Sequence, residues 1–435
     1  MRREIHEKIK YKKGFYCPAP FMHTTANVSK NSIKMCCEGR YTRSQLSEKS
    51  SGIPANKRLK EFFYNDKQLL EIRENLLKGE EPLECHVCGD RERNGWSSDR
   101  LDYLRKYDHI TPDLKYGNRY KQPLTLDIRP GNVCNLKCRM CDPGNSSEIS
   151  KELQQNPNLN QYYDPYRNSE DLSSNMDIIN FLSDIDFKLI DDLAILGGEP
   201  TVDPDTIAFL EKLIEEGNTN LKLSITSNCT NFNKHWQLFK QFNRLNICAS
   251  LDGVGKTYDY IRTNAKWDSV LQNVNQLQTL PNLVHLSINI VVQMYNIFDV
   301  KEWARFFYNM RKDGDPEERA SVGAAYIQAC YDPPHFHPSI LFEEDKKFII
   351  KEINDLIKEE NIKDEEFIER TLTPVQTCLN DPIWNSFDPD VFSTIKPTSV
   401  EELRYHFKKH TRTQDKIRNT IALWYLHPRI KKYLI

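Results

Sequence analysis

The chain combines short segments in which apolar and polar residues alternate with longer segments in which apolar residues recur at helical spacing. Alternation with a period of two is typical of a half-buried strand, and recurrence at three to four residues is typical of an amphipathic helix. Six strands are predicted, at Leu124–Arg129, Asp191–Leu196, Leu221–Asn228, Leu245–Gly253, His285–Val292 and Ser321–Gln328. Helices are predicted at Glu343–Glu360, Val400–Lys409 and Thr413–Tyr425. The stretch 145–175, rich in Asn, Gln, Ser and Tyr, is predicted to be an insertion that interrupts the next helix and acts as a lid.

Three cysteines follow the first predicted strand with the spacing C-x3-C-x2-C: Cys134, Cys138 and Cys141. A cubane iron–sulfur cluster has four irons and takes four ligands, whereas this loop supplies three thiolates. One iron is therefore left open for a substrate or cofactor. A zinc loop is the alternative, although zinc sites usually complete four ligands with paired C-x2-C or Cys/His spacings.

The triplet, together with Gly197-Gly198-Glu199-Pro200 after the second strand, resembles the radical SAM superfamily. The resemblance implies an α/β fold, a partial (βα)6 TIM-like barrel, in which a [4Fe-4S] cluster on the triplet binds S-adenosyl-L-methionine at its open iron. It also implies a cofactor site. Gly197, Gly198, Glu199 and Pro200 would lie against the methionine amino group, and Met140 would replace the family's aromatic residue near adenine. The remaining positions that it implies are Ser227, Asn228, Ser250 and Asp252 at the ribose and carboxylate end, Arg262 at the carboxylate, and Asn289 near adenine.

Five more cysteines precede the barrel: Cys17, Cys36, Cys37, Cys85 and Cys88. With Glu92, Gly95, Ser98 and Arg100 after them, they resemble the twitch/SPASM modules that hold an auxiliary iron–sulfur cluster. Such modules usually follow the barrel, and here the module leads. The resemblance implies that Cys17, Cys36, Cys85 and Cys88 are the ligands, with Cys37 as the substitute for Cys36, and that Asn31 takes the left-handed turn of an expected glycine. A structural zinc ribbon and unligated buried cysteines are the alternatives.

Composition agrees with a globular, redox-active enzyme of the cytoplasm. The chain has 435 residues, 39% hydrophobic and 28% charged, with a formal net charge of -2. Its charged start lacks the apolar stretch of a signal peptide, no apolar run is long enough to span a bilayer, and the charge gives no general footprint for nucleic acid. The basic run Lys408–Arg412 is interpreted as a solvated helix face. Three domains are predicted: a twitch/SPASM-like module at 1–115, the partial barrel at 116–335 and a mostly helical segment at 336–435.

These features predict a radical SAM enzyme that abstracts hydrogen from a peptide or protein, with the auxiliary cluster accepting an electron and flavodoxin or ferredoxin as electron donor. A dehydrogenase of a small alcohol, sugar or nucleotide-type substrate is the alternative, and a zinc-binding interaction protein without catalysis is the alternative of another class. Several further residues carry weaker hypotheses. His335 and His337 are attributed to a Pro-rich turn, His86 to a loop, and the role of His23 is left open. Cys229 and Cys330 are either buried packing residues or thiol hydrogen donors, and Cys248 and Cys378 are attributed to packing.

Overall fold

The computed structural model describes residues 14–39, 58–93, 98–107, 122–163, 177–312, 321–323, 325–380 and 399–435. Gly95 and part of the predicted insertion, 164–176, lie outside these ranges. The chain packs as two compact units. Unit 1 comprises Met1–Gly131, Asp171–Gly197 and Pro204–Ser224, and unit 2 comprises Asn132–Glu170, Gly198–Asp203 and Ile225–Ile435.

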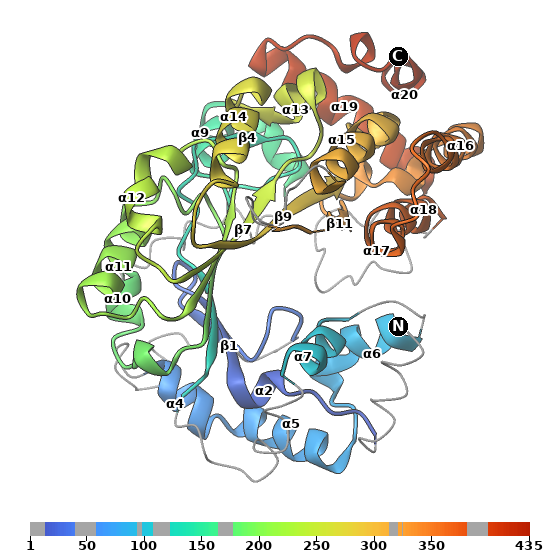
Figure 1. Ribbon diagram of the computed structural model, residues 1–435. Coiled ribbons are helices and arrows are strands. Elements are labelled where there is room, and N and C mark those ends of the chain that lie inside the picture. The colour runs from blue at the N-terminus through green and yellow to red at the C-terminus, as the bar shows by residue number, and fades with distance from the viewer. Residues whose placement is uncertain are drawn as a thin grey trace. The chain divides into compact units, whose positions relative to one another are not determined.

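Unit 1 is built on strands that pair mostly in parallel. Strand β3 (Thr125–Arg129) pairs in parallel with β5 (Asp192–Ile195) on one side and with β1 (His23–Asn27) on the other, and β2 (Ser32–Lys34) adds an antiparallel edge. The turn between β1 and β2 contains Asn31 at a φ of 48°, so the predicted left-handed turn is confirmed. The helices of this unit, blue to green in Figure 1, are α2 (Ala19–Met22), α4 (Arg58–Asn65), α5 (Lys67–Lys78), α6 (His86–Arg93), α7 (Asp99–Tyr107), α10 (Ile178–Phe181) and α11 (Pro204–Glu215).

Unit 2 contains a second set of parallel strands. Strand β7 (Arg244–Ser250) pairs in parallel with β9 (Leu283–Val292), which pairs in parallel with β10 (Ser321–Val322) and β11 (Tyr326–Ala329). A short antiparallel pair joins β4 (Lys137–Cys138) to β8 (Arg262–Thr263). Strand β6 (Lys222–Ser227) is divided between the units, and its alternating burial follows its alternating sequence. The longer helices are α9 (Ser147–Gln155), α13 (Gly255–Ile261), α14 (Trp267–Leu277), α15 (Val300–Lys312), α16 (Glu343–Glu359), α18 (Thr373–Asn380) and α19 (Val400–Arg418).

The first five predicted strands are present, the sixth, predicted at Ser321–Gln328, is divided into β10 and β11, and the α/β class with mostly parallel strands is confirmed. Two local predictions are wrong. A helix does follow the cysteine loop directly, because Ser146 caps α9 by accepting a hydrogen bond from the Ile149 N–H. The two helices predicted at 400–409 and 413–425 are one helix, α19, which ends where Asn419 adopts a left-handed φ of 46°.

No described helix is both long enough and apolar enough to cross a lipid bilayer.

Candidate functional site

The cysteine loop of unit 2 is held at its second cysteine by a neighbouring strand. In the β4–β8 pair, Cys138 lies opposite Arg262, whose guanidinium donates to the Cys138 sulfur at 3.7 Å. Arg262 also forms an ion pair with Asp252 at 2.8 Å, and Asp252 accepts a hydrogen bond from the Val291 N–H at 2.8 Å. Both side chains are buried. The end of β7, the end of β9 and the cysteine loop are therefore joined through one buried ion pair.

All three cysteines of the triplet have free thiols, with Cys138 buried and the other two half-buried. Burial raises the pKa of Cys134 to about 12, and the neighbouring Cys138 adds to this shift. Burial also raises the pKa of Cys138, whereas the charges of Arg262 and Arg418 oppose it. Backbone groups of Leu136 and Asp142 oppose the rise in the pKa of Cys134 and Cys141, and the Cys141 thiol donates to the Asp142 carbonyl at 3.7 Å. Backbone donors and positive charge both stabilise thiolates, which are the form that binds iron.

Glu199 organises the chain beside this loop. Its side chain is 1% exposed and accepts hydrogen bonds from the Thr201 hydroxyl at 2.6 Å, the Ser227 hydroxyl at 2.7 Å and the Asn228 N–H at 2.6 Å. The Glu199 N–H donates to the Val133 carbonyl at 2.7 Å, directly before Cys134. Burial raises the pKa of Glu199, and the hydrogen bonds from Thr201 and Asn228 oppose that shift. The carboxylate that the sequence assigned to an ammonium ion thus also holds two strand ends to the cysteine loop.

Some of the predicted cofactor residues form their hydrogen bonds within the protein, and others keep polar atoms without a partner there. Ser227 donates to Glu199 and accepts from the Cys229 N–H, and the Asn228 amide donates to Asn135 in the cysteine loop at 3.0 Å. By contrast, Ser250 and Asn289 are paired residues in the β7–β9 register, and the Asn289 Oδ1 atom is buried without a hydrogen-bond partner. A buried amide oxygen without a donor is costly unless a ligand supplies one. This pair fits a cofactor rich in hydroxyl and amino groups, while Met140 lies half-buried in the loop.

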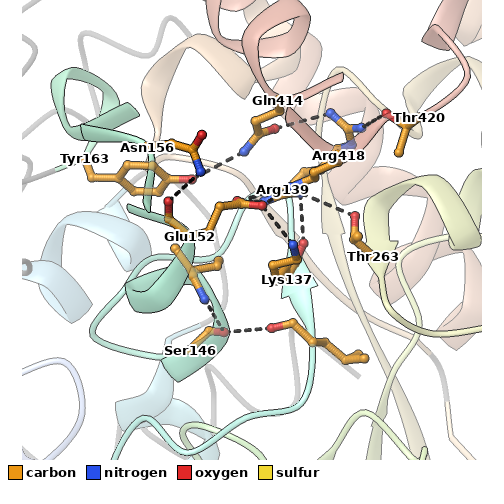
Figure 2. Close-up of polar contacts among 12 residues, drawn as sticks. Lys137, Arg139, Ser146, Glu152, Asn156, Tyr163, Thr263, Gln414, Arg418 and Thr420 are labelled. Atoms are coloured by element: carbon orange, nitrogen blue, oxygen red, sulfur yellow. Dashed lines mark hydrogen bonds and ion pairs between the residues drawn. The ribbon is translucent and has the colours of Figure 1, made fainter. Parts of the chain in front are cut away.

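A network of polar contacts joins the cysteine loop to helix α19 (Figure 2). The sequence did not predict this network. The Arg139 side chain is fully buried, donates to Asp415 at 2.7 Å and to the Tyr260 carbonyl at 2.9 Å, and stacks on the Tyr260 ring. Arg418 pairs with Glu152 at 2.6 Å and donates to the Lys137 carbonyl at 3.0 Å. The side chains that close the network are Lys137, Thr263, Gln414 and Thr420.

In unit 1, the four predicted auxiliary ligands line one cavity. Cys17, Cys36, Cys85 and Cys88 contribute to its wall, together with the charged residues Glu38, Glu84, Asp99 and Arg100 and with Phe15, Ala19, Pro20, Met35, Gly39, Val87 and Tyr103. The Gly39 N–H donates to the Cys36 sulfur at 3.1 Å. Burial raises the pKa of Cys17 and Cys88, and the backbone groups of Ala19 and Arg100 oppose that shift. The donor set therefore fits a cysteine-ligated iron–sulfur cluster. Within the described ranges, no three His, Cys, Asp or Glu side chains lie close enough to hold a single metal ion.

The two adjacent cysteines, Cys36 and Cys37, have different surroundings. Cys37 is exposed, is not part of the cavity wall, and donates from its thiol to Asp99 at 2.9 Å. Arg100 pairs with Glu92 and donates to the Tyr16 carbonyl at 2.8 Å, while Ser98 also donates to Glu92. These bonds hold the start of α7 beside Cys88 and explain the Glu92, Ser98 and Arg100 spacing.

Two histidines and three isolated cysteines are buried. His23 is buried in β1 and bonds to Thr125 at 2.8 Å. His335 is buried in a turn between Pro334 and Phe336, and its Nε2 atom lies 2.8 Å from His410 Nδ1. Cys229 and Cys330 are buried, as is Cys378, in agreement with packing roles.

Comparison with known proteins gives a family match over part of the chain. Residues 128–307 match the family model described as the Radical SAM superfamily. Among solved structures, the chain is similar to anSMEcpe with bound AdoMet, at 19% identity over 55% of this chain and 61% of that one, with a TM-score of 0.35. It is also similar to Streptococcus suis SuiB bound to S-adenosylmethionine, at 16% identity over 68% and 61%, with a TM-score of 0.34. The chain thus spans about three fifths of the length of these structures. No curated protein matches it.

Proposed function

We propose that this protein is a radical SAM enzyme that modifies a peptide or protein. The observation that carries the proposal is the buried Cys138–Arg262–Asp252 connection within the matched domain, which fixes a three-cysteine loop beside Glu199. Cys134, Cys138 and Cys141 would hold a [4Fe-4S] cluster. When bound, this cluster and S-adenosyl-L-methionine would supply a 5′-deoxyadenosyl radical that removes a hydrogen atom from the substrate.

The chain's own residues would bind and orient S-adenosyl-L-methionine. Gly197 and Gly198, both at positive φ, bring the backbone round to Glu199, whose Oε2 atom accepts a single hydrogen bond and could accept another from an ammonium group. Ser250 and Asn289 present polar groups on one face of β7 and β9 for the ribose and adenine. Arg262 is held by Asp252, and its Nε atom is buried without a hydrogen-bond partner, so it can still donate to a carboxylate.

The auxiliary cavity supports a redox role in the proposed reaction. Four cysteines would give each iron of a cubane cluster one thiolate, so none would remain open for substrate. Removal of a hydrogen atom leaves a substrate radical, and loss of one further electron to an auxiliary cluster would complete a two-electron oxidation. The cysteine set resembles modules of the twitch/SPASM type. Peptides are proposed as the substrate class because such modules are most often associated with peptide substrates. Flavodoxin or ferredoxin is proposed as electron donor.

Anaerobic purification followed by iron and sulfide analysis tests the proposal. We expect about eight irons per chain, brown colour, and 5′-deoxyadenosine after dithionite and S-adenosylmethionine are added without substrate. The matched variant replaces Cys134, Cys138 and Cys141 by Ala, and we expect it to keep the auxiliary cluster while losing cofactor cleavage. Colourless protein that contains zinc would refute the enzyme proposal. A triple variant without iron would refute the two-cluster assignment.

A further inference from the structure

Helix α19 borders a groove of about 650 Å³ whose charged lining is entirely cationic. Four positive side chains line it, and no Asp or Glu is among the described residues of its wall. The lining residues are Tyr405, Lys408, Lys409, Arg412, Thr413, Lys416 and Ile417 from α19, with Asn156 and Asn158 from the segment after α9. Because the whole chain has a formal net charge of -2, this accumulation is local.

Three of the cations, Lys409, Arg412 and Lys416, form a stripe with Tyr405 on one face of the helix. The four residues are spaced by four, three and four positions, which places them on a single face over roughly 16 Å. All four side chains are exposed. Among the residues that the structure describes, no side chain or backbone group bonds to the Arg412 guanidinium or the Lys416 ammonium. The half-buried Arg305 of α15, by contrast, is paired with Glu359 and Glu360.

We infer that this groove binds an acidic segment of the peptide or protein substrate, an inference that rests on the proposed function. An extended peptide of about five residues spans roughly 16 Å, so its carboxylates would reach the stripe from end to end. Arg412 offers a bidentate partner for one carboxylate. Asn156 and Asn158 line the same groove with polar side chains.

The limits of the stripe favour a short acidic peptide over nucleic acid. Glu401 and Glu402 occupy the first turn of α19 and bound the cationic face at that end. Lys408 is partly engaged, because its ammonium donates to the Ile435 carbonyl. Three or four accessible cations are fewer than the roughly 6–10 phosphate contacts of a typical nucleic-acid site.

Binding of fluorescein-labelled hexaglutamate, measured by anisotropy without S-adenosylmethionine at low salt, tests the inference. The groove variant is Arg412→Ala/Lys416→Ala. Its matched control is Lys347→Ala/Lys358→Ala, which removes two exposed cations from α16. We expect about tenfold weaker binding in the groove variant, less than about twofold change in the control, and weaker binding at high salt.

Two results would overturn the inference. One is equal binding of hexaglutamate to both variants when their melting temperatures are also equal. The other is tight binding of a labelled 12-nucleotide oligouridine that depends on Arg412 and Lys416 while hexaglutamate does not bind. Since this assay involves no turnover, a protein that binds hexaglutamate through the groove but forms no 5′-deoxyadenosine would refute the proposed function and leave the groove as an acidic-peptide site.

Discussion

Replacing Arg418 by Met should destabilise unit 2 and loosen the cysteine loop together. The Arg418 and Glu152 side chains are 1% and 3% exposed, so removing the arginine leaves a buried carboxylate with Lys137 as its remaining cation at 3.0 Å. Breaking a buried ion pair by removing one partner costs about 3 kcal/mol or more. For a unit of this size that corresponds to a melting temperature lower by roughly 6–12 °C.

The assay is thermal unfolding of the apoprotein, with hydrogen exchange of the amides between Cys134 and Cys141 as the site-specific measurement. Lys416→Met, on the same helix but exposed, is the matched control and should change the melting temperature by no more than about 1–2 °C. Adding Glu152→Gln to Arg418→Met removes the unpaired charge and should recover part of the loss. Arg418→Lys, which keeps the charge, should lose less than Arg418→Met.

The pH dependence has a defined sign. Burial raises the pKa of Glu152, but the hydrogen bonds and charge of Arg418 and Lys137 outweigh it and hold that pKa below its usual range. The stabilisation is therefore present above the unfolded-state pKa of about 4.3 and is lost as the pH falls through the lower folded-state value. The difference between wild type and Arg418→Met should accordingly narrow in acid. A variant that melts within about 1 °C of wild type, with unchanged loop exchange, would refute the reasoning.

Three further predictions concern the other buried groups. Cys36→Ala should reduce the iron content by about one cluster of four irons, whereas Cys37→Ala should not, because Cys37 is not part of the cavity wall and its thiol is engaged by Asp99; the reverse result would shift the ligand by one residue. Glu199→Gln should weaken S-adenosylmethionine binding by roughly ten- to hundredfold in calorimetry, as expected for one charge-assisted hydrogen bond, and unchanged affinity would remove this carboxylate from the cofactor site. Burial lowers the pKa of His335 to about 3, so the stability that the neutral imidazole contributes is present above about pH 6.5 and is lost as the pH falls towards 3. His335→Phe should make the acid decline in stability shallower by up to about 1.4 kcal/mol per pH unit. An unchanged slope would contradict this.

Features that depend on short, local sequence patterns could be predicted from the sequence. The cysteine triplet, Glu199 and the alternating strands are short patterns, and the structure contains those strands. The convergence of Cys17, Cys36, Cys85 and Cys88 on one cavity was also predictable, through the resemblance to a known module.

Other features carry no local pattern. Strand β1, with the sequence His-Thr-Thr-Ala-Asn, has buried threonines and no apolar alternation, so its place beside β3 was not predictable. Glu152 and Arg418 resemble ordinary charged positions of amphipathic helices. Their burial depends on a contact between residues 266 positions apart. For Glu199, a carboxylate near an ammonium was a reasonable expectation, but its bonds to Ser227 and Asn228 depend on tertiary structure.

The bracing of the cysteine loop by α19 also sets an order of events during synthesis. Arg139 bonds to Thr420, 281 residues later in the chain. At about 5–20 residues per second, the ribosome takes roughly 15–55 s to cover that distance. Throughout this interval the three cysteines have been made but their loop has no final support. Iron and sulfur for the proposed cluster would therefore meet a fully braced loop only after helix α19 has been made.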